Sequence, residues 1–340
     1  MSQINTMEDF AKACGVSRPT VSKYFHDASS VRPKTRAKIE EALERYDYSP
    51  NIYAINQNRK LTKTIGIVVP HLADPFFAEM ARVIEAKLLD AGMSPAMYSA
   101  YGDPRKEVEI LDGLRAMKPA GVLMAPLGEI SDRRALEKFA KAVPTIVFDS
   151  RIEGFGEAFI GSDNGSFISQ TVDYLVRVAA PPLFFDMATP ANPNAIARRD
   201  HYVRLMDKLG VEPQIFSVSG RGWKFEEVGF RGALDLLSQG VPDRPVLCSN
   251  DRLAMGFLAA AYEKGVRVGR LPTDDLQLAS NDDHPLSRYT CPPLTTAAHD
   301  YDAVAGLSVR MLLERIEQGS PLRQYKATFF QPRLALRDSA

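Results

Sequence analysis

Residues 7–25 read MEDFAKACGVSRPTVSKYF, and this stretch decides how the first part of the chain folds. Its apolar residues predict a first helix that ends at Gly15, where a glycine allows a tight turn. Ser17 is a good N-cap for a second helix, which would bury Val21 and Phe25. Two short helices joined by a glycine turn make a helix-turn-helix, a motif that places its second helix in the major groove of DNA.

The exposed face of the second helix carries side chains that suit DNA. Arg18, Thr20, Ser22 and Lys23 would be free to bond guanine edges and phosphates. Pro19 falls in the first helical turn, where a backbone N–H would have no acceptor within the helix, so its absence in proline does not break the helix. The two-helix pattern alone also fits a helical hairpin with no role in nucleic-acid binding.

Two more helical segments follow before the pattern changes. Pro33 opens a third helix, whose apolar side includes Ile39. Further on, Ser49 and Pro50 provide a cap and a first-turn proline for a short segment, residues 52–58. The whole N-terminal stretch is therefore expected to be helical.

Charge is unevenly distributed, although the 42 basic and 42 acidic residues balance overall. Residues 1–63 hold eleven Lys and Arg but only seven Asp and Glu, a net charge of +4, which leaves −4 on the other 277 residues. Residues 49–63 contain three basic residues and no acidic one. This pattern suits a segment that lies against a polyanion, but a charge run by itself is more often a solvated face.

A different pattern starts at residue 64. Residues 64–70 read TIGIVVP, a short apolar and β-branched run that predicts a buried strand, and an amphipathic helix is expected over residues 76–91. Alternating strands and helices predict parallel sheets covered on both faces, and the length of the alternation favours two sheets. Further strand-like runs lie at residues 121–124, 145–148, 183–185 and 246–247, with helical patterns at 107–117, 133–142, 166–178, 196–209 and 225–239.

Three features together resemble the lactose-repressor/galactose-repressor (LacI/GalR) family of bacterial transcription regulators. They are the run GVSRPTVSKYF, its spacing to VRPKTRAKIEEAL, and YSPN followed by two residues and then alanine, just before the first strand. The resemblance covers essentially the whole chain. It implies a sequence-specific DNA-binding regulator that represses a carbohydrate-utilisation operon, and whose operator affinity changes when a sugar-like effector binds between two lobes.

The resemblance also implies the domain organisation. Residues 1–48 are expected to form an all-α helix-turn-helix headpiece, and residues 49–63 a hinge segment. Residues 64–340 would form an α/β core like a periplasmic binding protein, with two doubly wound parallel-sheet lobes that bind the effector and dimerise. The expected lobes are an N lobe of about residues 64–162 and 293–320, and a C lobe of about residues 163–292 and 321–340.

Carried over to this sequence, the family's DNA contacts fall on the second helix and the hinge. The residues that match base-reading positions of the major groove are Arg18, Pro19 and Lys23. Those that match backbone-contacting or helix-anchoring positions are Ser17, Thr20, Ser22 and His26. Asn51 and Ala54 match hinge positions that enter the minor groove, whereas Gln57 stands where most members have a wedging leucine. Glutamine would kink a base step poorly, so either Ile55 supplies the wedge or the operator is bent less.

The family's effector contacts fall on loops that follow the strands of the core, where such sheets bind ligands. The matching residues are Phe76, Phe77, Asp149, Arg198, Trp223, Asn250 and Asp282. Two of them have competitors, since Arg199 is adjacent to Arg198 and Phe225 could replace Trp223. We expect the neighbouring Asp251 and Asp283 to be helix caps or scaffold instead.

These residue types suit a compound with many hydroxyl groups. Carboxylates accept pairs of sugar hydroxyls, an arginine donates to others, and an aromatic ring covers the apolar face of a pyranose. We therefore expect a sugar or sugar derivative, which changes the angle between the lobes and shifts the hinge away from its DNA-bound form. The DNA partner is expected to be a near-palindromic double-stranded operator, bound by a homodimer. No leucine heptads follow residue 333, so a tetramer-forming tail is not expected.

Other protein classes fit the sequence less well. No apolar run reaches the roughly 18 residues of a membrane span, and residues 1–9 lack a secretory pattern, so we expect a cytoplasmic protein. The three cysteines form no C-x-x-C pair, which predicts three buried thiols and neither a disulfide nor a metal site. Cofactor and nucleophile motifs are missing and the five histidines are scattered along the sequence, so we expect no cofactor and no enzyme.

Two alternative functions use the same core chemistry. A transport-type protein could bind a sugar between such lobes, and a carbohydrate-processing enzyme could use paired carboxylates. The helix-turn-helix argues against both alternatives, and the missing secretory pattern argues further against the transport protein.

Overall fold

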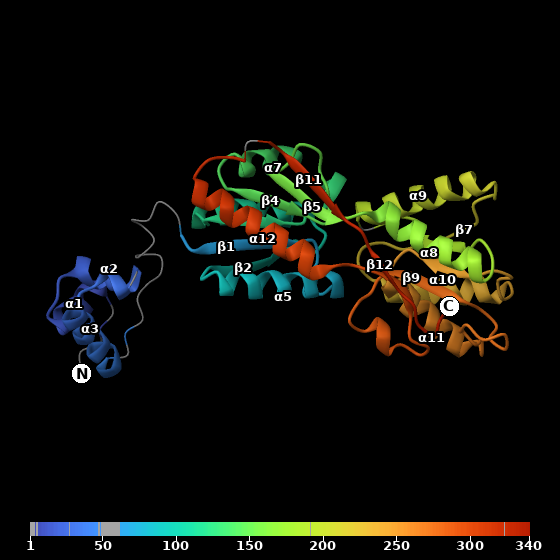
Figure 1. Ribbon diagram of the computed structural model, residues 1–340, viewed down its shortest axis with the longest axis horizontal. Helices are drawn as coiled ribbons and strands as arrows, with labels where there is room; N and C mark the ends of the chain where they lie inside the picture. The colour runs from blue at the N-terminus through green and yellow to red at the C-terminus, as the bar shows by residue number, and fades with distance from the viewer. Residues whose placement is uncertain are drawn as a thin grey trace. The chain divides into compact units, whose positions relative to one another are not determined.

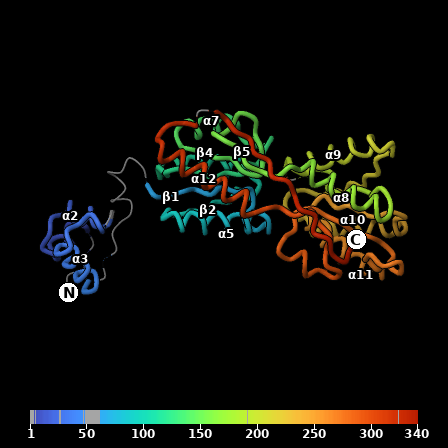
Figure 2. The backbone as a smooth tube through the Cα atoms, viewed as in Figure 1, coloured from blue at the N-terminus to red at the C-terminus, as the bar shows by residue number. Residues whose placement is uncertain are grey.

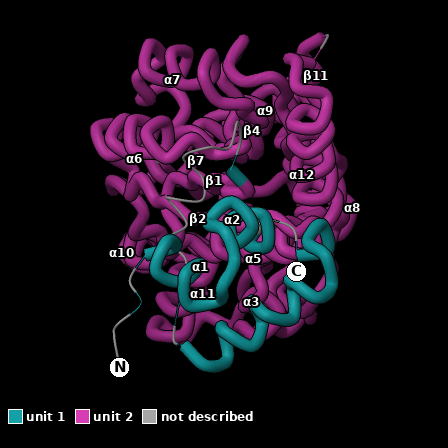
Figure 3. The backbone as a smooth tube through the Cα atoms, turned by 90° about the vertical axis from the view of Figure 1, so that its left-hand side faces the viewer, with its two compact units in different colours: residues 1–62 teal, residues 63–340 magenta. Residues whose placement is uncertain are grey.

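The computed structural model describes residues 4, 6–26, 28–46, 48, 62–190, 192–322 and 324–340. The chain divides into two compact units, residues 1–62 and 63–340 (Figure 3). The predicted hinge residues Asn51, Ala54 and Gln57 lie outside the described residues, and so does the side chain of His26.

The first unit is built from short helices. They are α1 (Met7–Cys14), α2 (Arg18–His26), the 3₁₀ turn η1 (Ala28–Ser30) and α3 (Pro33–Arg45). Gly15 follows α1 in the left-handed conformation, with a φ of 64°, which most side chains would strain. Phe10, Val21 and Ile39 are fully buried where the three helices meet. The helix-turn-helix predicted from residues 7–25 is therefore present.

The second unit contains two six-stranded sheets, one in each lobe (Figure 1). The N-lobe sheet has the order β11-β5-β4-β3-β1-β2, and all its strand pairs are parallel. Its strands are β1 (Thr64–Val69), β2 (Ser94–Ser99), β3 (Gly121–Met124), β4 (Thr145–Phe148), β5 (Ala158–Ser162) and β11 (Lys326–Phe330). One face is covered by α5 (Pro75–Asp90) and α12 (Tyr301–Gln318), and the other by α6 (Pro104–Met117) and α7 (Arg133–Ala140). The 3₁₀ turn η2 (Gly128–Ile130) lies between β3 and α7.

The C-lobe sheet has the order β12-β10-β9-β8-β6-β7, with only the edge strand β12 antiparallel. Its strands are β6 (Leu183–Met187), β7 (Ile215–Val218), β8 (Val246–Cys248), β9 (Leu278–Asp282), β10 (Thr295–Ala298) and β12 (Arg333–Ala335). Helices α10 (Phe225–Ser238) and α11 (Asp251–Glu263) pack on one face, and α8 (Asn164–Val178) and α9 (Pro193–Leu209) on the other. Both lobes are thus doubly wound, as predicted.

The chain crosses between the lobes three times, after β5, β10 and β11 (Figure 2). The predicted lobe boundaries also contain three crossings, but they place the last two too early along the chain. Residues 293–320 were expected in the N lobe, but β10 pairs with β9 in the C-lobe sheet. Residues 321–340 were expected in the C lobe, but β11 pairs with β5 in the N-lobe sheet. The physical reason is that a short apolar run predicts a strand but not the sheet in which it finds a partner.

Three further predictions concern membranes, metals and cysteines. No helix within the described ranges is both long and apolar enough to cross a membrane. Nor do the described His, Cys, Asp and Glu residues form a group that could hold a metal ion. Cys14 and Cys248 are buried, but the prediction was wrong for Cys291, which is exposed because it lies in the loop between the 3₁₀ turn η3 (Ser287–Tyr289) and β10.

Candidate functional site

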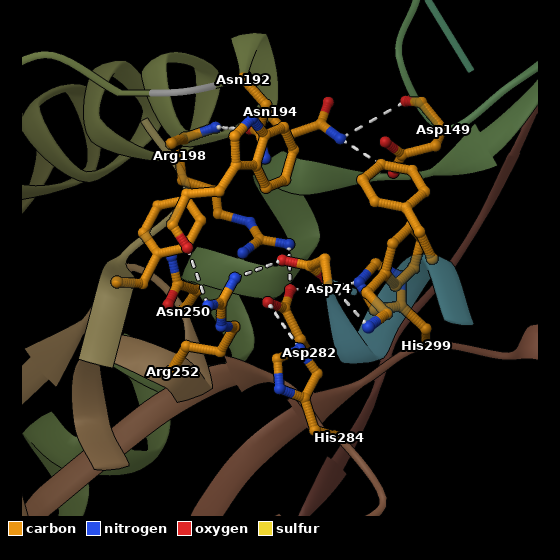
Figure 4. Close-up of a pocket in the computed structure, with 15 residues that line it drawn as sticks. Asp74, Asp149, Asn192, Asn194, Arg198, Asn250, Arg252, Asp282, His284 and His299 are labelled. Carbon is orange, nitrogen blue, oxygen red and sulfur yellow. Dashed lines mark hydrogen bonds and ion pairs between the residues drawn. The ribbon is translucent and has the colours of Figure 1, made fainter. Parts of the chain in front are cut away.

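A cavity between the two lobes gathers the polar residues that the sequence singled out (Figure 4). All seven predicted effector residues line it: Phe76, Phe77, Asp149, Arg198, Trp223, Asn250 and Asp282. Eight further residues complete the lining: Asp74, Asn192, Asn194, Ala195, Phe225, Arg252, His284 and His299. The volume of the cavity is about 30 Å³, enough for roughly two water molecules. A ligand with a six-membered ring therefore requires the side chains that line the cavity to rearrange.

Strand ends position four of the polar side chains. Asp149 directly follows β4, with a φ of 60°, and Asp282 ends β9, with a φ of 120°. Asp74 follows β1 and caps α5, while Asn250 follows β8 and caps α11. Because the carboxyl ends of parallel strands meet at one edge of a sheet, the two lobes present these side chains to the space between them.

Arg198 and Asp282 form a buried ion pair on the C-lobe side, with 2.6 Å between Nη2 and Oδ1. The remaining guanidinium nitrogens of Arg198 donate to the side-chain oxygen of Asn164 and to the carbonyl of Ser249. Burial alone would raise the pKa of Asp282, but the Arg198 charge and hydrogen bonds from two histidines hold that pKa well below its usual value.

The structure separates the two adjacent arginines that the sequence left in competition. Arg198 faces the cavity, whereas Arg199 pairs with the buried carboxylate of Asp186 and donates to the carbonyl of Met187. Helical geometry explains the difference, because consecutive side chains on a helix such as α9 point in directions about 100° apart.

Two histidines that seemed scattered in the sequence meet at Asp282. His299 lies 3.2 Å from Asp282 Oδ1, and His284 lies 3.6 Å from Oδ2. Burial lowers the pKa of His299, although Asp282 opposes the shift. Burial also acts to lower the pKa of His284, but its hydrogen bond to Asp282 and the nearby Asp251 carboxylate raise that pKa overall. The sequence could have pointed to both histidines as site residues, because each lies one or two positions after the end of a strand.

Contacts between the lobes were not predicted from the sequence. Arg252 of the C lobe donates to Asp74 of the N lobe, with 2.9 Å between Nη1 and Oδ2. It also pairs with Glu226 in its own lobe at 2.6 Å. Asn194 of the C lobe donates to Asp149 of the N lobe, with 2.9 Å between Nδ2 and Oδ1. These bonds hold the lobes together around the cavity.

Asp149 is the carboxylate of the cavity that lacks a direct cationic partner among the described residues. Burial raises the pKa of Asp149 to about 7, and the carboxylates of Asp282 and Asp74 add to the shift. The more distant Arg198 charge and the Asn194 amide oppose it only in part. Asp149 is therefore the side chain that gains most from new hydrogen-bond donors.

Aromatic rings line the other side of the cavity. Trp223 stacks on His71 at 5.5 Å between ring centroids and meets Phe77 edge to face at 5.9 Å. Both Trp223 and Phe225 line the cavity, and their rings are in edge-to-face contact at 5.8 Å. The two aromatic residues that the sequence left as alternatives thus both line the cavity.

In the first unit, the predicted base-reading side chains are accessible. Arg18, Pro19 and Lys23 are exposed on α2. Ser17 precedes the helix and its hydroxyl lies 2.8 Å from that of Thr20. Ser22 is half-buried on the same helix. This arrangement leaves the N-terminal end of α2 open to a partner.

Family models match both parts of the chain. One described as "Bacterial regulatory proteins, lacI family" matches residues 6–51. Another, a periplasmic binding protein-like domain, matches residues 179–340. The first match covers the helix-turn-helix. The second covers most of the C lobe, together with α12 and β11 of the N lobe.

Known proteins match the chain along nearly its whole length. The HTH-type transcriptional repressor PurR of Mannheimia succiniciproducens is 28% identical over 343 residues, which are 98% of each chain. The ribose operon repressor of Escherichia coli is 28% identical over 345 residues, which are 98% of this chain and 99% of the repressor. A crystal structure of the lac repressor dimer, bound to operator and the anti-inducer ONPF, shares the fold with a TM-score of 0.81 at 23% identity, covering 98% of both chains.

Proposed function

The chain belongs to the lacI family of bacterial regulatory proteins and is a DNA-binding transcriptional regulator, and we propose that a neutral, sugar-like effector between its lobes changes its affinity for operator DNA. PurR of Mannheimia succiniciproducens and the ribose operon repressor of Escherichia coli are transcriptional repressors, not enzymes or transport proteins. We propose repression as its mode of action for the same reason. Since its proposed target is operator DNA, we propose that it works in the cytoplasm.

The charges that line the cavity are the reason why we propose a neutral effector. Every guanidinium nitrogen of Arg198 and Arg252 already donates to a protein oxygen. A ligand phosphate or carboxylate would therefore meet arginines whose charge is already balanced, and would bring a further negative charge beside the carboxylates of Asp74, Asp149 and Asp282. Hydroxyl groups, by contrast, can donate to Asp149 and accept from the side-chain amides of Asn192 and Asn250, whose oxygens already cap helices.

Aromatic residues support the sugar class as well. Phe76, Phe77 and Trp223 offer ring faces and edges beside the polar groups. A pyranose has an apolar face and a rim of hydroxyls, which matches a wall of this mixed kind. The proposed effector contacts are thus the seven predicted residues, extended by Asn192 and Asn194.

For DNA recognition we propose that α2 lies in the major groove. Arg18, Pro19 and Lys23 would meet base edges, while Ser17, Thr20, Ser22 and His26 contact the backbone or anchor the helix. The segment at residues 49–63 would be the hinge, with Asn51, Ala54 and Gln57 in the minor groove. A homodimer would read a near-palindromic operator, one half-site per protomer.

Effector and DNA would be linked through the lobes. A ligand that bridges Asp149 of the N lobe and Asn250 of the C lobe stabilises one angle between them. The three crossing segments transmit that angle to the start of β1, where the hinge is attached. A coupling free energy of about 1 to 3 kcal/mol would change operator affinity by roughly 5- to 150-fold.

The effector proposal is tested by a thermal-unfolding screen of neutral sugars, polyols, sugar acids, sugar phosphates and nucleobases. A ligand at 100 times its Kd should add about 2.7 kcal/mol to the free energy of unfolding. We expect a neutral carbohydrate to raise the melting temperature, and Asp149→Asn to reduce the shift. A response only to phosphorylated or acidic compounds, or only to nucleobases, would overturn the proposed effector class and leave the DNA-binding proposal intact.

The DNA proposal is tested by anisotropy titrations of operator fragments selected from a random pool. Arg18→Ala and Lys23→Ala should each weaken specific binding by about 1–3 kcal/mol where the side chain reads a base, and lower the salt dependence where it contacts phosphate. Lys141→Ala makes the same charge change in the second unit and should leave binding unaltered. Unchanged affinity and salt slope in both α2 variants would show that α2 is not the recognition helix.

A further inference from the structure

A groove between helices α6 and α7 lies on the N lobe, apart from the proposed effector site. Its volume is about 180 Å³. Among the described residues, it shares no lining residue with the inner cavity, which is the one between the lobes. The volume of the groove is below the range of about 300–1,000 Å³ that is typical of small-molecule sites. The α6–α7 groove therefore suits a side chain of a larger partner better than a whole metabolite.

Apolar residues from both helices line the α6–α7 groove. Leu111 of α6 and Phe139 of α7 are buried, and both belong to the core that these helices build on their face of the N-lobe sheet. Val108 and Ala135 line the groove as half-buried residues. Because the core holds Leu111 and Phe139 in place, an apolar side chain of a partner can enter the groove at little cost in ordering entropy.

Three cations also line the α6–α7 groove, and two of them lack a partner. Arg115 lies 3.8 Å from the carboxylate of Asp112 on the same helix. The carboxylate of Asp132 accepts a backbone hydrogen bond from the first turn of α7 and so caps that helix. Arg134 and Lys138 are exposed, and neither makes a hydrogen bond or ion pair with other residues of the described ranges. Two positive charges without an ion-pair partner therefore lie beside the apolar lining.

The positions of these two cations are unfavourable for α7 itself. Arg134 lies in the first turn, where the positive end of the helix dipole disfavours a cation. Lys138 follows four residues later, and like charges at this spacing destabilise a helix. The adjacent Arg133, by contrast, pairs with Glu137 at 2.9 Å. Local conflicts of this kind are expected at functional positions, and an anionic partner would relieve this one.

We propose that the α6–α7 groove is a docking site for an acidic, amphipathic helix of a partner protein. An apolar residue of that helix fills the groove, and acidic residues one helical turn apart pair with Arg134 and Lys138, which have the same spacing. A nucleic acid fits less well, because Asp112 and Asp132 repel phosphates and a phosphate backbone has no apolar group to bury. The partner and the effector occupy separate sites, so both can bind at once.

The test titrates a labelled helical peptide with the full-length protein and follows fluorescence anisotropy. The peptide carries leucines at positions i, i+3, i+4 and i+7 on one face and glutamates on both sides of that face. Arg134→Glu and Lys138→Glu should each weaken peptide binding about tenfold or more, because each replaces an attraction by a repulsion. Ala135→Phe keeps both charges but places a ring in the groove, and should weaken binding to a similar extent.

Two controls separate specific docking from general charge attraction. Lys208→Glu makes the same charge change at an exposed position of α9 that does not line the groove, so peptide affinity should stay within about twofold. A peptide with lysines in place of the glutamates should not bind. Arg134 and Lys138 are exposed, so their variants should keep the melting temperature of the parent chain.

Three results would overturn the docking proposal. The first is a glutamate peptide that does not bind, and the second is one that binds Arg134→Glu, Lys138→Glu and Ala135→Phe as tightly as the parent chain. The third is a groove variant that loses self-association, or affinity for duplex DNA of random sequence, while peptide binding is unchanged. That result would assign the groove to a second copy of the chain or to nucleic acid.

Discussion

The two walls of the inner cavity differ in how their charges are satisfied. On the C-lobe wall, Arg198 pairs with Asp282 and Arg252 pairs with Glu226, so both cations have a partner in their own lobe. On the N-lobe wall, Asp74 and Asp149 instead bond to side chains of the opposite lobe. The C-lobe wall is therefore organised before the lobes meet, whereas the N-lobe wall is completed only by their contact.

This difference shows where an effector can act. A ligand hydroxyl that donates to Asp149 competes with the Asn194 amide for that carboxylate. One that donates to Asp74 adds to the hydrogen bond from Arg252. A ligand on the C-lobe wall meets side chains that are already held in place, so it pays little ordering entropy there. We expect the ion pairs of the C-lobe wall to control stability, and the N-lobe acids to control lobe closure and, through it, effector affinity.

The largest effect on the free energy of unfolding is expected when the Arg198–Asp282 ion pair of the C-lobe wall is removed. Arg198→Ala leaves Asp282 buried with only histidine partners, and removing one member of a buried ion pair typically costs about 3–5 kcal/mol. The measurement is urea denaturation of the full chain. Arg82→Ala breaks the Arg82–Glu79 pair, whose arginine side chain is 64% exposed, and should cost about 1 kcal/mol or less. A similar small cost in both variants would show that the C-lobe wall does not depend on its ion pair.

The contact between the walls is the next target. Asp74→Asn removes a charged partner of Arg252 but keeps the cap of α5, because asparagine caps as well as aspartate. Hydrogen bonds to charged groups contribute about 1.5–3 kcal/mol, so unfolding and effector titrations should both show a loss of that order. Glu226→Gln weakens the partner of Arg252 within the C lobe and should leave effector affinity nearly unchanged. Equal affinity losses in the two variants would contradict a special role for the bond between lobes.

A steric change should prevent the walls from meeting. Gly128→Ala places a Cβ against Pro193 of the other lobe, and effector affinity should fall about tenfold, equivalent to roughly 1.4 kcal/mol. Gly92→Ala is the matched control, since Gly92 also has a positive φ, of 70°, but nothing lies within 4 Å of its Cβ position. Isothermal titration of both variants separates the effect of backbone strain from the steric effect of the added Cβ. An equal loss of effector affinity in Gly92→Ala would contradict the proposal that binding depends on lobe closure.

The smallest effect concerns the proton on Asp149. Its pKa of about 7 lies above that of the unfolded chain, so the folded state holds a proton between about pH 4 and 7 that the unfolded state releases. The Asp149 contribution to stability is therefore largest below about pH 4 and decreases as pH rises towards 7. Neutral sugar hydroxyls bond better to the carboxylate, so affinity should rise a few-fold between about pH 6 and 8. Asp149→Asn should flatten this profile, and an unchanged profile would assign the titration to another group.

Local elements of the core were largely predictable. The helical pattern at residues 225–239 became α10 (Phe225–Ser238), and the run at 145–148 became β4. The spacing of apolar residues is enough to predict these elements, because each of them buries a stripe of its own apolar side chains. Helices α11 and α12 were missed, and so were the edge strands and the interior strands β5, β9 and β10. α11 is buried along most of its length, so it lacks the polar face that marks a helix in sequence.

The candidate site was predictable only in part, and the missed residues share a cause. Arg252 and Asn194 act through partners in the other lobe, and His284 and His299 act through Asp282. A sequence pattern gives no sign of a partner that is supplied from elsewhere in the chain. The resemblance to a known family pointed to seven positions, all of which line the cavity, but not to the partners that hold their side chains.

By itself the sequence determined the helix-turn-helix and the doubly wound class of the core. Gly15, the Ser17 cap and the apolar spacing act over a few residues, so their consequences can be deduced without the fold. Only the tertiary structure decided which lobe takes β10 and β11, and which acids meet which cations. The physical reason is distance along the chain: Arg252 and Asp74 are 178 residues apart, and only the packing of two separate sheets brings them to 2.9 Å.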